Sequence, residues 1–67
     1  MHLDSKEKAL LLMISHEMDF EEIASVLQTS VQDLTDLTNT LIEKFAVKSE
    51  VGLIKKAIKE GFISNDI

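Results

Sequence analysis

Hydrophobic residues recur at the three- and four-residue spacing of an α-helix in four segments of the chain. This pattern predicts helices near residues 5–16, 20–27, 31–45 and 50–60. No run of residues typical of β-strands lies between them, and the chain contains no proline and only two glycines. We therefore expect an all-α fold in which the 67 residues form a single four-helix domain, residues 1–67.

Polar residues at the predicted helix starts support these boundaries. Asp4 or Ser5 can cap the first helix, the segment DFEE at residues 19–22 has the form of a capping box, and Ser30 can cap the third helix. The inward-facing hydrophobic residues that predict the core are Leu10, Ile14, Ile23, Leu27, Leu34, Leu41, Leu53 and Ala57. Leu12 falls nearly opposite the inner face of its helix. A single exposed leucine is common, and a contact with a partner is the alternative interpretation.

The distribution of charge argues against contact between the middle of the chain and nucleic acid. The net charge is −5, with seven lysines, no arginine and twelve acidic residues. Residues 9–43 contain seven of the acidic residues and no lysine or arginine. Because affinity for nucleic acid depends largely on neutralising phosphates, this segment opposes binding to DNA.

Several other classes of function are excluded by what the sequence lacks. Without cysteine there is no disulfide and no thiolate metal site. His2 and His16 are far apart, and no glycine-rich phosphate loop or nucleophile motif is present. We therefore expect no enzyme activity, no cofactor, no metal and no small-molecule substrate. No apolar run approaches the roughly 18 residues of a membrane span, so we expect a cytoplasmic protein that does not contact membranes.

Two segments match the pattern of a known family. EEIASVLQTS, residues 21–30, matches E-I-A-x-x-L-x-x-S, and FAVKSEVGLIKKAIKEGFI, residues 45–63, matches the spacing of L-G-V-x-x-R-x-E-L-V-x-x-A-x-x-x-G-x-I. The chain resembles the LuxR-type (GerE-like) helix-turn-helix domain, which ends many bacterial response regulators and also occurs as a short stand-alone regulator. The match is gapless from Leu3 to Ile63. The resemblance implies four helices, of which the second and third form the helix-turn-helix and the third enters the major groove of DNA.

The chain departs from the family pattern at its turns and in the third helix. Family glycines are replaced by Glu17 and Ala46 at positions that favour positive φ, so we expect either slightly different turns or about 1 kcal/mol of strain at each. Within the family segment S-x-K-T-V-K-x-H, Ser30 is kept but most of the DNA-contacting residues are lost. The degenerate DNA-reading positions are Gln32, Asp33, Thr35, Asp36, Leu37 and Thr38.

These departures predict a module of transcription regulation that no longer reads DNA and acts by protein–protein interaction. The resemblance implies that the fourth helix is the self-association surface, and the candidate protein interface is Val51, Ile54, Lys55 and Ile58. The expected partner is a second copy in a homodimer, or a LuxR-type regulator that the chain would remove from its operator. Two alternatives stay open: a DNA-binding regulator of the LuxR/GerE type, and an inhibitor whose acidic face imitates DNA.

Overall fold

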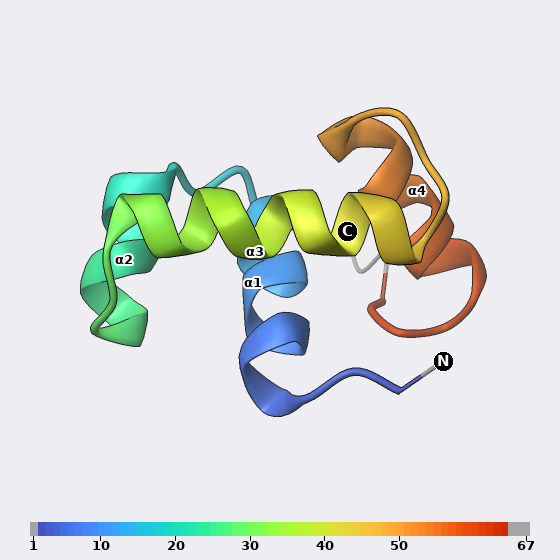
Figure 1. The fold of residues 1–67 in the computed structure, drawn as a ribbon. Coiled ribbons are helices and arrows are strands. Elements are labelled where there is room, and N and C mark those ends of the chain that lie inside the picture. Colours follow the sequence, from blue (N-terminus) through green and yellow to red (C-terminus); the bar gives the residue numbers. More distant parts are fainter. Residues whose placement is uncertain (1, 65–67) are drawn as a thin grey trace.

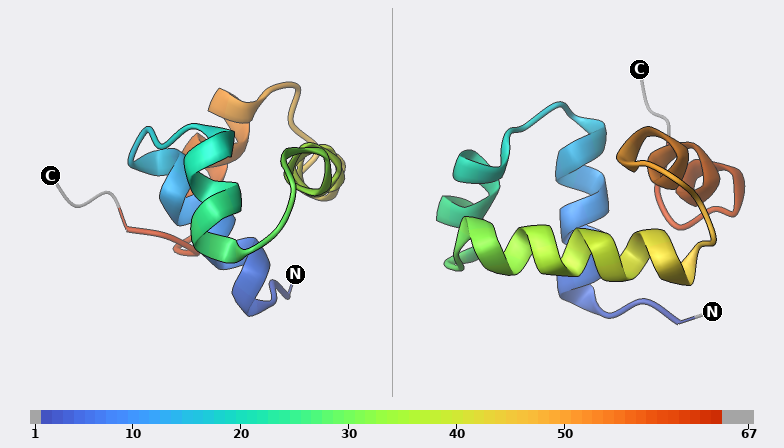
Figure 2. Two further views of the ribbon diagram at one scale, coloured as in Figure 1. Left: turned by 90° about the vertical axis from the view of Figure 1, so that its left-hand side faces the viewer. Right: turned by 45° about the horizontal axis from the view of Figure 1, so that its top comes forward.

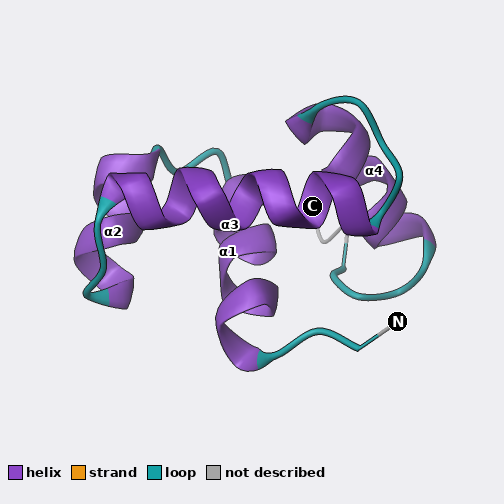
Figure 3. Ribbon diagram, viewed as in Figure 1, coloured by secondary structure: helices purple, strands orange, loops and turns teal. Residues whose placement is uncertain are grey.

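Four α-helices form the chain in the computed structural model, which describes residues 2–64. They are α1 (Ser5–Ser15), α2 (Phe20–Leu27), α3 (Val31–Lys44) and α4 (Glu50–Lys59), shown in Figure 1. Each helix begins at the predicted residue, and three of them end one residue earlier than predicted. Within the described range no strand is present, so the all-α prediction is confirmed (Figure 3). No helix in this range combines the length and the apolar character that crossing a membrane requires.

The long helix α3 organises the arrangement of the other three. In Figure 1, α1 passes behind the middle of α3, α2 lies beside its first turns, and α4 lies beside its last turns. Figure 2 shows α3 end-on with α2 seen along its length, so the two helices cross steeply across the short turn at residues 28–30. Every pair of helices except α2 and α4 is in contact within residues 2–64. One side of α3 therefore packs on the rest of the protein and leaves the opposite side to solvent.

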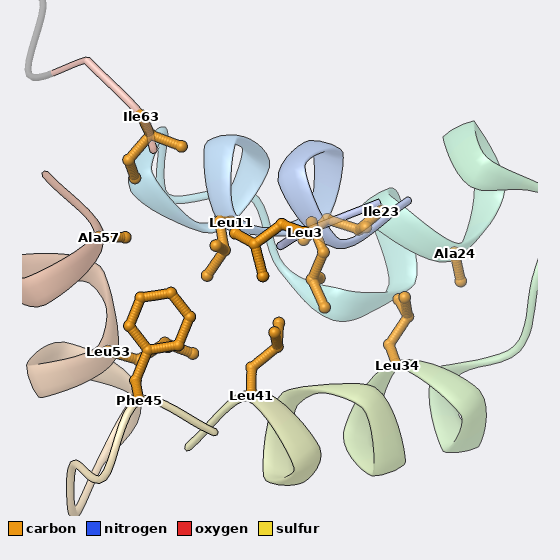
Figure 4. Packing of buried hydrophobic residues seen from close by; sticks show 11 residues of the cluster. Leu3, Leu11, Ile23, Ala24, Leu34, Leu41, Phe45, Leu53, Ala57 and Ile63 are labelled. Carbon is orange, nitrogen blue, oxygen red and sulfur yellow. The ribbon is translucent and has the colours of Figure 1, made fainter. Parts of the chain in front are cut away.

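The hydrophobic core lies between α3 and the three other helices (Figure 4). Its buried members are Leu3, Leu10, Leu11, Ile23, Ala24, Leu34, Leu41, Phe45, Leu53, Ala57 and Ile63. The predictions for Ile14 and Leu27 are wrong, because both side chains are only half-buried at the edge of the core. Ile14 lines an open groove between α1 and α4, and Leu27 is the last residue of α2, where the chain turns toward α3.

Side-chain caps fix the starts of the helices as the sequence predicted. Asp19 Oδ1 accepts from Glu22 N at 2.8 Å, and Glu22 Oε1 accepts from Asp19 N at 3.1 Å, which completes the capping box of α2. Asp4 and Glu7 form the same box at the start of α1. Ser30 Oγ accepts from the N–H of Asp33 at 3.0 Å. Each cap satisfies backbone donors that would otherwise have no partner in the helix.

The turns contain three residues other than glycine with a positive φ. Glu17 has φ 61° and Ala46 has φ 55°, so both adopt the conformation expected at positions where the family has glycine. Gln28, at the end of α2, has φ 56° and was not predicted. A side chain at such a φ brings Cβ too close to the backbone, and each position costs on the order of 1 kcal/mol.

The exposed turn residue Ala46 allows a direct test of this strain. Ala46→Gly should stabilise the protein by roughly 0.5–1 kcal/mol, because glycine removes the steric cost of positive φ while adding some freedom to the unfolded chain. Urea unfolding followed by circular dichroism measures the change. The control is Ala9→Gly inside α1, which should destabilise by about 1 kcal/mol. If Ala46→Gly were less stable than the wild type, the positive φ of Ala46 would not be a source of strain.

Candidate functional site

The packing of α3 decides which of its residues face solvent. Leu34, Thr38 and Leu41 are buried against the other helices. At about 100° per residue, the opposite side of the helix carries a different set of side chains. We call this set the outer face of α3, and it consists of Gln32, Asp33, Asp36, Asn39, Thr40 and Glu43, all of them exposed. The outer face holds three carboxylates and no lysine or arginine.

The structure corrects part of the predicted DNA-reading set. Thr38 is only 5% exposed, so the prediction that it lies on a DNA-facing surface is wrong. It comes one turn after Leu34 and one turn before Leu41, which places it on the inner side of the helix. Leu37 and Thr35 are half-buried, and Leu37 packs against the core. Of the six predicted positions, Gln32, Asp33 and Asp36 are exposed.

Polar side chains on and beside the outer face bond within their own segment of chain. Gln32 Nε2 donates to Asp36 Oδ1 at 3.0 Å, and Thr40 Oγ1 donates to the Asp36 carbonyl at 3.0 Å. Thr29 Oγ1 donates to Asp33 Oδ2, also at 3.0 Å. A base or phosphate would have to displace these partners and would then meet carboxylates, which accept hydrogen bonds but repel phosphate.

The single base of α3, Lys44, is paired with a buried carboxylate, although its own side chain is 40% exposed. Lys44 Nζ lies 3.0 Å from Glu7 Oε2, and the Glu7 side chain is only 7% exposed. Glu7 Oε1 also accepts from the N–H of Asp4 at 3.0 Å. Releasing Lys44 would leave a carboxylate buried without its counter-charge, which is strongly unfavourable. Sequence analysis missed this pair, because nothing in local spacing connects residues 37 positions apart.

The predicted interface residues run from the edge of the core, at Ile54 and Ile58, to the exposed side of α4, at Val51 and Lys55. Val51 is 66% exposed, the highest value among the exposed large hydrophobic residues described. We call the set Val51, Ile54, Lys55 and Ile58 the α4 surface. Ile54 and Ile58 are half-buried, and Lys55 is exposed. The structure therefore places three aliphatic side chains and one lysine along one side of a single helix.

An open groove of about 460 Å³ runs beside the α4 surface. Residues of α4 form one wall, and the end of α1 with the following turn forms the other. The lining residues are Ile14, Ser15, Glu17, Met18, Glu50, Val51, Ile54 and Lys55. Sequence analysis missed the contribution of Ile14 and Met18, because only the packing of α1 against α4 brings them next to Val51. The groove widens the apolar area that a partner could cover.

The remaining exposed apolar residues are separate from this surface in the sequence. Leu12 is 43% exposed, as predicted, and lines a smaller hollow with Phe62 and residues near the end of the described chain. Val26 and Val31 are also exposed, on α2 and at the start of α3. Within residues 2–64, no group of three histidine, aspartate or glutamate side chains is placed to hold a metal ion.

Comparisons with known proteins find no relative of the chain. No protein-family model matches it, and neither a curated protein nor a solved structure matches it. Any assignment of function therefore depends on the residues and their geometry.

The buried hydroxyl of Thr38 gives a prediction about stability. Within the described residues, Thr38 Oγ1 is the one buried side-chain polar atom without a hydrogen-bond partner. Thr38→Val should stabilise the protein by about 1 kcal/mol, because it replaces a desolvated, unpaired hydroxyl with a methyl group. The control is Thr40→Val on the outer face, where the change should stay within about 0.5 kcal/mol. Thermal and urea unfolding test both variants, and a destabilised Thr38→Val would show that the hydroxyl has a partner in solution.

Proposed function

We propose that this protein is a LuxR-type helix-turn-helix module of bacterial transcription regulation that has lost DNA reading and acts through protein binding. The steep crossing of α2 and α3 across a short turn is the arrangement that this family requires, and it supports the proposal. The motif residues at 21–30 and 45–63 support it from the sequence. A cytoplasmic location belongs to the same proposal.

The outer face of α3 carries the main support for a loss of DNA reading. Readers of the major groove present lysine, arginine, asparagine or glutamine to bases, with further basic residues on phosphates. Here Asp36 and Glu43 occupy the middle and the far end of the outer face, and Asp33 stands at its flank. A carboxylate about 4 Å from a phosphate repels it by on the order of 1 kcal/mol even in water. The one lysine of α3 is held by Glu7 and does not offset this repulsion.

The other lysines do not build a reading surface around α3. Lys56 Nζ donates to the carbonyl of Phe45 at 2.7 Å, so it closes the end of α3. Apart from Lys44, the exposed lysines are Lys6, Lys8, Lys48, Lys55 and Lys59, which lie on α1, on α4 and in the turn before α4. Contacts from these side chains to DNA would be loose and sensitive to salt.

The α4 surface supports the protein-binding part of the proposal. The exposed Val51 continues into the half-buried Ile54 and Ile58 beside an open groove, and a continuous apolar area of this kind is where a partner protein would bind. We propose that a LuxR-type regulator or a second copy of the chain covers this patch. In the first case, the chain would withdraw the regulator from its operator by occupying the surface through which the regulator itself associates.

Duplex binding tests the loss of DNA reading. The wild-type chain should bind duplex DNA with a Kd of about 10⁻⁴ M or weaker at physiological salt, the range of ordinary non-specific contact. Fluorescence anisotropy at low and moderate salt measures this, with a genuine LuxR-type domain as the positive control. Nanomolar binding to one specific duplex at physiological salt would match true operator binding and overturn the proposal.

Adding positive charge to the outer face of α3 tests the same proposal through a gain in duplex affinity. Asp36→Lys with Asn39→Lys places two lysines on the outer face and should raise duplex affinity, with a salt dependence steeper by roughly one unit per added phosphate contact. The control, Glu60→Lys with Ser64→Lys, changes the net charge equally but at exposed positions outside α3. A larger gain in the control would show that the outer face of α3 is not where DNA would bind.

Competition with a LuxR-type regulator tests the protein-binding part. Adding the wild-type chain should lower operator binding by a LuxR-type domain in a gel-shift assay. Val51→Glu should weaken this effect at least about tenfold, because it places a charge in the centre of the apolar surface. Val26→Glu introduces the same change on α2, where a valine is similarly exposed, and should keep the effect. If both variants lost the ability to compete equally, the interaction site would not be on α4.

A further inference from the structure

A second apolar area lies on α1 and on the chain that follows α4. Leu12 is 43% exposed and lines an open hollow of about 360 Å³. The other described residues that line the hollow are Lys8, Ala9, Phe62, Ile63 and Ser64. None of these residues lines the groove between α1 and α4. The hollow is therefore a surface separate from the one that Val51 belongs to.

The wall of the hollow after α4 is already held in place by the fold. Gly61, with φ 82°, follows the last turn of α4, and the N–H of Phe62 donates to the Ala57 carbonyl at 2.9 Å. The Phe62 ring packs edge-on against Phe45 with the ring centroids 5.6 Å apart, and Ile63 is buried. A partner would meet a formed wall and would not have to order this segment, which lowers the entropic cost of binding.

The charge beside the hollow is positive, in a chain whose net charge is −5. Among the described residues that line the hollow, Lys8 is the only charged one. At about 100° per residue, Lys8, Ala9 and Leu12 share one side of α1. The one carboxylate of α1, Glu7, lies on another side of the helix and is buried. This side of α1 therefore offers an apolar contact and an ammonium group without a competing carboxylate from the same helix.

We propose that the hollow binds a segment of a partner protein that presents an aliphatic side chain next to a carboxylate. The aliphatic side chain contacts Leu12, Ala9 and Phe62, and the carboxylate pairs with Lys8. A segment with a basic residue in place of the carboxylate is repelled by Lys8, so the sign of the charge selects the partner. This inference goes beyond the proposed function, because it concerns a different surface and does not depend on the loss of DNA reading.

The two parts of the contact contribute differently. A single exposed leucine is common on protein surfaces and has no meaning alone. Here Leu12 stands at the edge of a hollow with an aromatic side chain in its wall, and an apolar side chain seated in a pocket is the kind of contact that dominates binding energy. An exposed ion pair adds little to affinity, and its main effect is on the choice of partner.

Titration with peptides of defined charge tests the surface and its preference. One probe is a blocked peptide with two leucines between pairs of glutamates, and the other has lysines in place of the glutamates. Amide NMR shifts of the wild-type chain should change around Leu12 and Phe62, and the glutamate peptide should bind at least about fivefold more tightly than the lysine peptide. Equal affinity for the two peptides, or shifts confined to the groove beside Val51, would overturn the proposal.

Substitutions at exposed positions test the two named side chains. Leu12→Ser should weaken binding of the glutamate peptide at least about fivefold, because it removes the apolar contact. The matched control is Val31→Ser at the start of α3, where the valine is 42% exposed, and it should bind the peptide as the wild type does. Lys8→Glu should reverse the preference, so that the lysine peptide binds more tightly. Circular dichroism confirms that each variant is folded, and an unchanged preference in Lys8→Glu would refute the role of Lys8.

The chain itself contains a segment with the chemistry of the proposed partner. Asp66 and Ile67 supply a carboxylate and an aliphatic side chain, and they lie outside the described residues. The double variant Asp66→Asn with Ile67→Ser should bind the glutamate peptide as the wild type does. If the peptide bound this variant and not the wild type, the occupant of the hollow would be this chain's own segment, and the proposal of a partner protein would be overturned.

The outcomes separate this inference from the proposed function. If neither the wild type nor the double variant binds the glutamate peptide, the inference fails, while competition with a LuxR-type regulator through Val51 can still succeed. If the chain binds a specific duplex tightly and also binds the glutamate peptide at Leu12, the loss of DNA reading fails and the inference stands.

Discussion

The ion pair between Glu7 and Lys44 joins α1 to the far end of α3, beside the core that holds the four helices together. Glu7 belongs to the first turn of α1, Lys44 is the last residue of α3, and their side chains meet at 3.0 Å. The same carboxylate accepts from the backbone of Asp4 and so caps α1. A buried carboxylate is tolerated only while its partners are present. The pair therefore joins the end of α3 to the start of α1, while the burial of Leu34, Thr38 and Leu41 sets the rotation of α3.

This constraint separates the residues that build the fold from those that would act on DNA. Lys44 and Lys56, which sequence alone would count as free positive charge, hold the end of α3 from two sides. What remains on the outer face is acidic or neutral. A scaffold of this kind can be kept while the chemistry of its surface changes, because packing and surface contacts use different sides of the same helix. In this chain the inner side of α3 builds the core, and its outer face is free to vary without changing the fold.

The turns show a related balance between local strain and tertiary packing. Glu17, Gln28 and Ala46 take positive φ without being glycine. Hydrogen bonds across these turns, such as Val47 N to the Ile42 carbonyl at 3.1 Å, and the core contacts of Phe45 hold the conformation. In a protein this short, several such costs leave little margin of stability.

The sequence by itself determined the four helices, the starts of each and most of the core, because hydrophobic spacing and side-chain caps act within a few residues. It also located the exposed Val51 on α4 and the absence of basic residues from positions 9–43. Only the tertiary structure decided that Thr38 is buried, that Ile14 and Leu27 are half-buried, and that Lys44 is engaged. The reason is geometric. The exposure of a residue near the boundary of a helix face depends on how neighbouring helices cross, and an ion pair between α1 and α3 depends on where distant segments meet. The spacing of hydrophobic residues within one helix determines neither the exposure of such a residue nor the formation of such an ion pair.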